Sequence, residues 1–364
     1  MVRTMRGMMV VFGGAILATP TCSMGAVIYK TVDFTPPGVN SMFWGTSDNS
    51  NWGGGFTKLG GLNRATVWDI ASGNSALLDP LPGFDESGGT GAGGAIISGY
   101  GQQFVGGYQV HAVIWNAATH AITDLHPNGA SYSAAYDTDG VRQVGYASFG
   151  GSEHAIMWNG SANNYVDITP LTGGFSGAVI RATDGQHQGG YAVISVADGG
   201  VARAMFWSGT AQSAVDLNPG GKWWTSSVDG VFGDQQVGSA SDGFFKAALW
   251  RGTAASFVSL HPPGAIGGSG AVDTNGIQQV GYVGARAYVW NGTADSGFDL
   301  HQFLAPGFTS SVARSIDAAG NIYGSAIDTL GNNHAVAWLV PEPSVLALAA
   351  PCAAVLLSRR RRQP

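Results

Sequence analysis

The chain has 364 residues, of which only 11% are charged, and its 57 glycines are about twice the usual share. Hydrophobic residues make up 45% and aromatic residues 10%, which argues against a disordered chain. Away from the two ends, acidic residues outnumber basic residues about two to one, which argues against nucleic-acid binding. The two cysteines, Cys22 and Cys352, lie near the ends. The body of the chain therefore has no disulfide, no thiolate metal site and no cysteine nucleophile.

The first 25 residues have the pattern of a secretory signal peptide. Arg3 and Arg6 precede an apolar run over residues 8–18, which is too short to span a bilayer. Small residues at Ser23 and Gly25 predict cleavage before Ala26. We expect residues 1–25 to be removed on export.

Variants of one motif then recur along the chain, each ending in a tryptophan. The tryptophans lie 40 to 49 residues apart, at Trp68, Trp115, Trp158, Trp207, Trp250, Trp290 and Trp338. A fixed period of this size with strand-like units is typical of a β-propeller. A β-solenoid has shorter rungs, and stacked sandwich domains need ~100 residues each. These two architectures are the alternatives that the periodicity leaves open.

One repeat, residues 131–168, predicts four short strands. Its apolar runs are residues 133–136, 143–147, 154–158 and 165–168, separated by Gly, Asn and Asp. Asn159-Gly160 and Asn291-Gly292, after Trp158 and Trp290, predict type I′ hairpin turns. The small residues of each first run are suited to the crowded axis of a propeller.

Seven such units predict an all-β fold: a single seven-bladed β-propeller of four-stranded antiparallel blades over residues 26–339. The units cover approximately residues 41–79, 87–125, 131–168, 176–217, 225–260, 268–300 and 310–338. The last unit lacks a fourth strand, whereas residues 27–34 resemble a fourth strand without its first three. We therefore expect the N-terminal strand to complete the last blade and close the ring.

Residues 340–364 differ from the repeats. Pro341, Glu342 and Pro343 precede an apolar run over residues 345–357 and an arginine cluster at 359–362. As a helix the run is about 20 Å long, short of the ~30 Å hydrocarbon core. This segment resembles the PEP-CTERM sorting signal of Gram-negative bacteria. The resemblance implies recognition by an exosortase-type enzyme, passage through the inner membrane with transient membrane association, and a location at the cell surface or in extracellular polysaccharide.

The repeats resemble the extracellular HAF repeat family, named after a His-Ala-Phe tripeptide. The matching positions are His111-Ala112, His154-Ala155 and His334-Ala335, each followed three residues later by the periodic tryptophan. The third position is never Phe here, and Arg-Ala or Lys-Ala replaces His-Ala in the other repeats. This resemblance implies a fold and an extracellular location, and no chemistry.

Few residues suggest a ligand site. Trp223 and Trp224 follow a Pro-Gly-Gly loop away from the periodic position, where they either contact a sugar or pack between blades. Asp137 and Asp139 resemble half of a calcium loop, but Asp and Gly are also ordinary turn residues. Histidines that recur at equivalent positions of different blades are spread around a ring, so we interpret them as framework residues.

The sequence shows no catalytic signature, no cofactor site and no metal site beyond the calcium alternative at Asp137 and Asp139. The main hypothesis is a non-enzymatic, exported structural or binding propeller that contacts polysaccharide. The alternative is a secreted polysaccharide-active enzyme, a lyase or hydrolase, on a propeller scaffold. Acidic or histidine side chains converging at one end of the central channel would favour the enzyme. An aromatic rim without such groups would favour binding.

Overall fold

The structure, a computed structural model, describes residues 29–36, 38–46, 50–104, 107–196 and 199–341. The predicted signal peptide, both cysteines and most of the predicted sorting segment, including Glu342 and Pro343, lie outside the described residues. No described helix is long and apolar enough to cross a membrane.

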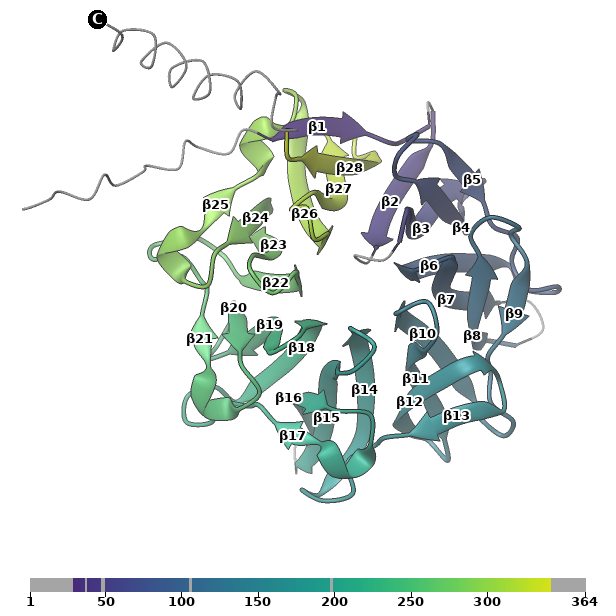
Figure 1. Ribbon diagram of the computed structural model, residues 1–364, viewed down its shortest axis with the longest axis vertical. Helices are drawn as coiled ribbons and strands as arrows, with labels where there is room; N and C mark the ends of the chain where they lie inside the picture. Colours follow the sequence, from purple (N-terminus) through teal and green to yellow (C-terminus); the bar gives the residue numbers. More distant parts are fainter. Residues whose placement is uncertain (1–28, 37, 47–49, 105–106, 197–198, 342–364) are drawn as a thin grey trace, which may run out of the picture.

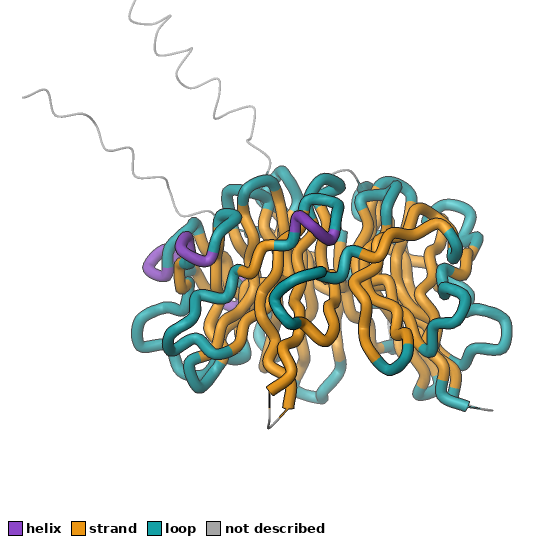
Figure 2. The backbone as a smooth tube through the Cα atoms, turned by 90° about the horizontal axis from the view of Figure 1, so that it is seen from below, coloured by secondary structure: helices purple, strands orange, loops and turns teal. Residues whose placement is uncertain are grey.

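Seven four-stranded antiparallel sheets are arranged as blades around a central axis (Figure 1). Figure 2 shows the same blades edge-on, with loops on both faces of the ring. The all-β, seven-bladed prediction is confirmed, and neither a solenoid nor separate sandwiches is formed. From the inner to the outer strand, the first three blades are β2 (Asn40–Gly45), β3 (Trp52–Leu59), β4 (Leu62–Asp69) and β5 (Ser75–Leu77); β6 (Glu86–Gly93), β7 (Ile96–Gln103), β8 (Gln109–Asn116) and β9 (Ile122–Asp124); β10 (Tyr132–Thr138), β11 (Gln143–Phe149), β12 (Ser152–Ser161) and β13 (Asn164–Asp167).

The next three blades follow the same order. They are β14 (Phe175–Thr183), β15 (Gln188–Val196), β16 (Gly199–Trp207) and β17 (Val215–Asp216); β18 (Thr225–Phe232), β19 (Gln235–Ser241), β20 (Phe245–Trp250) and β21 (Val258–Ser259); β22 (Ser269–Thr274), β23 (Gln279–Val283), β24 (Arg286–Trp290) and β25 (Phe298–Asp299). Short 3₁₀ helices occupy the loops at Ala211–Ser213, Ala254–Ser256, Ala294–Ser296 and His301–Phe303.

The seventh blade is built from both ends of the chain. Its strands are β26 (Phe308–Ile316), β27 (Ile322–Asp328), β28 (Asn333–Leu339) and, outermost, β1 (Lys30–Asp33). Thr31 pairs with Trp338 and Val32 with Ala337 in antiparallel register. The predicted closure of the ring by the N-terminal strand is confirmed.

The core lies between the blades, where the periodic tryptophans are located. All seven are completely buried. Trp158, for example, clusters with Ala112 and Leu125 of the preceding blade. One large apolar side chain per repeat therefore fills each interface between neighbouring sheets.

The prediction of type I′ turns after Trp158 and Trp290 is wrong. Only the glycines of these pairs have positive φ, 74° at Gly160 and 79° at Gly292, whereas a type I′ turn needs two such residues. After Trp158 the strand continues through a bulge to Ser161 and the chain reverses at residues 162–163, whereas after Trp290 a longer loop with a 3₁₀ helix follows. In both blades a buried glutamine of the second strand accepts the glycine N–H. Gln143 Oε1 lies 3.0 Å from the Gly160 nitrogen, and Gln279 Oε1 lies 2.7 Å from that of Gly292.

Candidate functional site

Each innermost strand carries a β-bulge at the same place, and the extra residue has no partner in the register with the second strand. We call these seven residues the bulge ring; they are Trp44, Thr90, Tyr136, Arg181, Asp229, Val272 and Arg314. All seven line one cavity of about 300 Å³ along the propeller axis. Bulges commonly re-aim a side chain beside a functional site. The bulge ring is therefore the candidate site.

A repeated hydrogen bond places the bulge residue in each blade. In five blades a serine three residues before it accepts a backbone N–H from the third strand of the preceding blade. These pairs, with nitrogen–oxygen distances of 2.8 to 3.0 Å, are Ser87–Ala65, Ser133–Ala112, Ser226–Ala204, Ser269–Ala247 and Ser311–Ala287. The inner strand is thereby fixed against its neighbour, three residues before the bulge. The five blades share this serine and differ in the side chain at the bulge.

The bulge ring holds three charged residues, and two of them, Arg181 and Asp229, form an ion pair. Arg181 Nη1 lies 3.3 Å from Asp229 Oδ1, and the Arg181 guanidinium also lies 5.4 Å from the ring centroid of Tyr191. Burial raises the pKa of Asp229, and Arg181 opposes this rise. The ion pair therefore neutralises one of the two arginines of the ring.

Arg314 has a different environment. Its guanidinium lies 4.7 Å from the centroid of the Trp44 ring, in cation–π geometry. Its Nε is buried and has no hydrogen-bond partner among the described residues. Burial lowers the pKa of Arg314, and the nearby Tyr282 and Asp229 side chains oppose this shift. Arg314 is thus a desolvated cation beside an aromatic face.

Four blades carry a tyrosine at the same position of the second strand, next to the inner strand, and Tyr282 also lines the cavity. The four are Tyr100, Tyr146, Tyr191 and Tyr282. Burial raises the pKa of all four, so they are neutral hydrogen-bonding groups at neutral pH. Tyr136 of the ring stacks on Tyr146 with centroids 5.9 Å apart, and burial raises its pKa to about 12.

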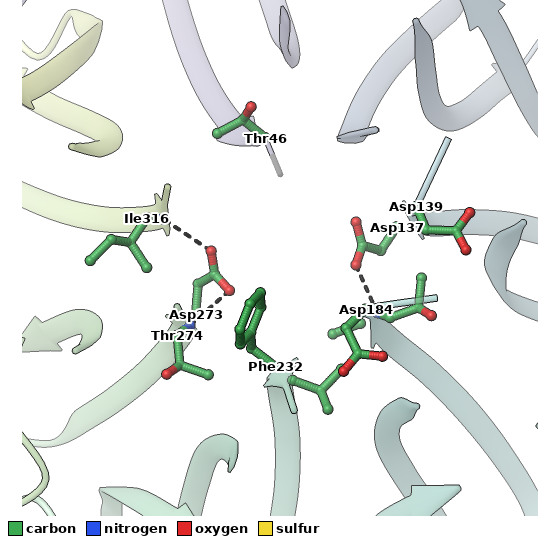
Figure 3. A pocket seen from close by; sticks show the side chains of 11 residues that line it. Thr46, Asp137, Asp139, Asp184, Phe232, Asp273, Thr274 and Ile316 are labelled. Carbon is green, nitrogen blue, oxygen red and sulfur yellow. Dashed lines mark hydrogen bonds between the residues drawn. The ribbon is translucent and has the colours of Figure 1, made fainter. Parts of the chain in front are cut away.

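A second cavity, of about 230 Å³, opens at one mouth of the channel and shares Thr46, Asp137, Ala182 and Asp273 with the first (Figure 3). Asp137 accepts the backbone N–H groups of Thr138 and Thr183, both at 2.8 Å. Asp273 likewise accepts those of Thr274 and Ile316. Each carboxylate therefore joins neighbouring inner strands. Burial raises the pKa of Asp137 to about 7, although its two N–H donors oppose the shift.

The calcium alternative receives no support from this mouth. The Oδ1 atom of Asp139 accepts the N–H groups of Val141 and Arg142, at 2.7 and 2.6 Å, which is the geometry of a turn. Among the described residues, no group of three or more His, Cys, Asp or Glu side chains is arranged to hold a metal ion.

Trp223 and Trp224 lie apart from the bulge ring, in the loop between β17 and β18. Trp223 is half-buried against Phe257, with ring centroids 4.9 Å apart. Trp224 is 57% exposed. Of the two, Trp224 presents the larger surface to a ligand, and Trp223 supports the loop by packing.

Six histidines act in two repeated framework contacts. His111, His154 and His334 each lie 2.6 to 3.0 Å from a fourth-strand aspartate, through Nδ1. Arg203 and Arg286 make the equivalent contact in other blades, which accounts for the replacement of His-Ala by Arg-Ala. The second set contacts the serines that accept a backbone N–H from the preceding blade. The Nδ1–Oγ distance is 2.8 Å in each of the pairs His126–Ser133, His261–Ser269 and His301–Ser311.

The sequence reasoning missed the bulge ring. The small residues of the first strands were predicted, but the residue three positions after each serine, which forms the bulge, was not. Aligning the repeats on that serine would have shown the variable position. In the predicted sorting motif, Pro341 is exposed at the end of the described chain, and the other two residues lie beyond it.

No known family model and no curated protein matches the sequence. Solved structures match in fold at low identity. Oligogalacturonate lyase from Vibrio parahaemolyticus is 10% identical, with a TM-score of 0.55 over 86% of this chain and 94% of that chain. The propeller domain of the Trilobed protease from Pyrococcus furiosus is 5% identical, with a TM-score of 0.52 over 82% and 93%. Puromycin hydrolase is 12% identical, with a TM-score of 0.55 over 83% of this chain and 52% of that chain. At such identities the likeness shows the fold alone.

Proposed function

We propose that this chain is an exported propeller of the cell surface or extracellular matrix that binds a polysaccharide in its central channel, without catalysing a reaction. The observation that carries the proposal is the bulge ring. All seven inner strands place a bulge at the same position, and the side chain there lines the axial cavity and differs between blades. Trp44 and Tyr136 supply flat aromatic faces, which suit sugar rings, and the arginines supply hydrogen-bond donors.

A glycan array probed with the protein, followed by titration of the best ligand, tests this function. We expect Trp44→Ala to weaken binding at least tenfold, because the side chain faces the channel and supports Arg314. Trp224→Ala is the matched control, since this tryptophan is exposed outside the channel. Loss of binding in the control alone would contradict the channel as the site and favour the loop.

Export and sorting form the second part of the proposal. The basic and apolar start of the chain and the Pro-Glu-Pro segment support secretion followed by recognition by an exosortase-type enzyme. The apolar run at 345–357 is short for a permanent anchor, so we expect mature surface protein to lack residues after about 343. Intact-mass analysis of protein from its native host tests this. A surface form that keeps residues 359–362 would contradict processing.

A lyase or hydrolase acting on polysaccharide is the second candidate. The observation in its favour is Asp137, because burial raises the pKa of this channel carboxyl to about 7, where it could exchange a proton. Its two oxygens already accept backbone N–H groups, which favours a structural role. Incubating acidic and neutral polysaccharides with the protein and assaying for new reducing ends decides this. Product formation that Asp137→Asn abolishes would establish the enzyme.

A further inference from the structure

Arg314 is the least satisfied group of the bulge ring. A buried ion without a partner is costly, and an arginine cannot neutralise itself by losing its proton at any ordinary pH. Among the described residues it has no ion pair, and its Nε has no hydrogen-bond acceptor. Its cation–π contact with Trp44 covers one face of the guanidinium and leaves the in-plane N–H groups for another partner.

The other charges around the cavity do not supply that partner. Asp229 makes its ion pair with Arg181, at 3.3 Å. Asp137 and Asp273 also line the cavity, but each accepts two backbone N–H groups. Two arginines and three aspartates line the cavity, so Arg314 is a local positive site and not part of a positive channel.

The geometry points to an anionic ligand: a sugar unit bearing a single carboxylate, a uronate, bound with that carboxylate on Arg314. A guanidinium fork matches a carboxylate with two parallel hydrogen bonds. Because three aspartates line the same cavity, a monoanion meets less repulsion there than a doubly charged phosphate. Trp44 and Tyr136 offer apolar faces to the sugar ring, and Tyr282 adds a neutral hydroxyl to the wall. A cavity of about 300 Å³ is at the small end of ligand sites, which suits one sugar unit.

This inference rests on the proposed polysaccharide-binding function and names its ligand class. A side chain kept only for the fold would be better replaced by an uncharged one of similar size, because buried unpaired charge destabilises the folded state.

The test compares a uronate oligosaccharide with the same oligosaccharide after its carboxyl groups have been reduced to alcohols. Titration calorimetry on the protein should give at least tenfold tighter binding of the acidic form. Arg314→Gln should remove this preference without lowering the melting temperature of the free protein. Arg314→Lys keeps the charge but loses the fork, and should retain only part of the preference. Arg251→Gln, at an exposed ion pair outside the channel, is the matched control and should change nothing.

The outcomes separate the two proposals. Equal binding of both oligosaccharides, unaffected by either Arg314 substitution, would overturn the uronate inference and leave polysaccharide binding intact. Binding of neither oligosaccharide, together with an empty glycan array, would contradict the proposed function itself. Inorganic phosphate competing as strongly as the uronate would show a simple anion site and would also overturn the inference.

Discussion

The seven periodic tryptophans show how one residue type at a fixed interval specifies a whole interface. Each is fully buried between blades, yet only some of their indole N–H groups form a hydrogen bond. Trp115 donates to the Asp79 carbonyl at 2.8 Å, whereas the Nε1 of Trp158 has no partner among the described residues. The side chain therefore contributes mainly through its apolar area, and its polar atom is a minor cost.

Truncating one of these tryptophans should destabilise the ring strongly. We expect Trp158→Ala to lower the free energy of unfolding by ~3–5 kcal/mol, because it leaves a large cavity between two blades. Chemical denaturation followed by circular dichroism measures this. Trp224→Ala, at an exposed site, should change stability by less than ~0.5 kcal/mol. A similar small change for Trp158→Ala would contradict its role in the interface.

Asp328 gives the fold a dependence on acidic pH. Hydrogen bonds from the side chain and backbone of Asn332, which outweigh burial, lower the pKa of Asp328 to about 2. The carboxylate also accepts the Leu330 N–H at 2.8 Å and so closes the β27–β28 turn. Because the folded pKa is below the ordinary value, the stabilisation is present above pH ~4 and is lost as the pH falls towards 2.

Melting temperatures measured from pH 5 to pH 2 should therefore fall. Asp328→Asn should be less stable at pH 5 and should show a smaller fall on acidification. Asp234→Asn is the control, because this carboxylate is exposed on the surface in a pair with Arg251. An unchanged pH profile in Asp328→Asn would contradict the role of this carboxylate.

At the scale of elements, the strands followed directly from the sequence. Alternating apolar runs and glycine-containing breaks predicted all four strands of residues 131–168, and the structure extends them by only a few residues. The turn after Trp158 was mispredicted because dipeptide preference considers two residues, whereas the Gln143 side chain, from a different strand, holds the Gly160 N–H in a bulge and the chain reverses only after Ser161. A long-range hydrogen bond overrode a local preference.

The candidate site was less predictable than the strands. A β-bulge depends on the register between two strands and on the contact that pins it, such as Ser133 to Ala112. Neither is visible in a single strand. The Trp223-Trp224 pair stands out in the sequence because it breaks the tryptophan period. The bulge residues Arg181 and Arg314 did not, because each lies within an otherwise ordinary strand.

The hydrogen bond from the Gly160 N–H to Gln143 Oε1, which we call the glutamine clasp, can be tested in one blade. Gln143→Ala removes the acceptor of the Gly160 N–H and should lower the free energy of unfolding by about 0.5–1.5 kcal/mol, the usual net contribution of one hydrogen bond, because Gly160 is exposed to water. Hydrogen exchange should show faster exchange of that amide. Gln186→Ala, at an exposed position of a neighbouring loop, should have little effect. Equal stability of the two variants would argue against the clasp.

At the scale of the whole molecule, the ring depends on a junction between the two ends of the described chain. Neighbouring blades are otherwise joined by continuous chain, but in the seventh blade the strand β1 is held to β28 only by non-covalent contacts. The buried side chains Tyr29 and Phe34 flank β1, and the Phe34 N–H donates to the Ala335 carbonyl at 2.8 Å. The Thr35 hydroxyl accepts the Ala335 N–H at the same distance.

Removing this strand should open the ring. A chain comprising residues 40–339 loses β1, Tyr29 and Phe34, and it exposes the edge of β28 to pairing with other molecules. Loss of one buried aromatic side chain costs ~3–5 kcal/mol, so we expect a melting temperature many degrees below that of residues 26–339, or aggregation. Phe34→Ala in the longer chain should show a smaller loss of the same kind. Differential scanning calorimetry with light scattering measures both effects. Equal melting temperatures for the two chains would show that six complete blades and three strands are stable without closure, and that the N-terminal strand serves another purpose.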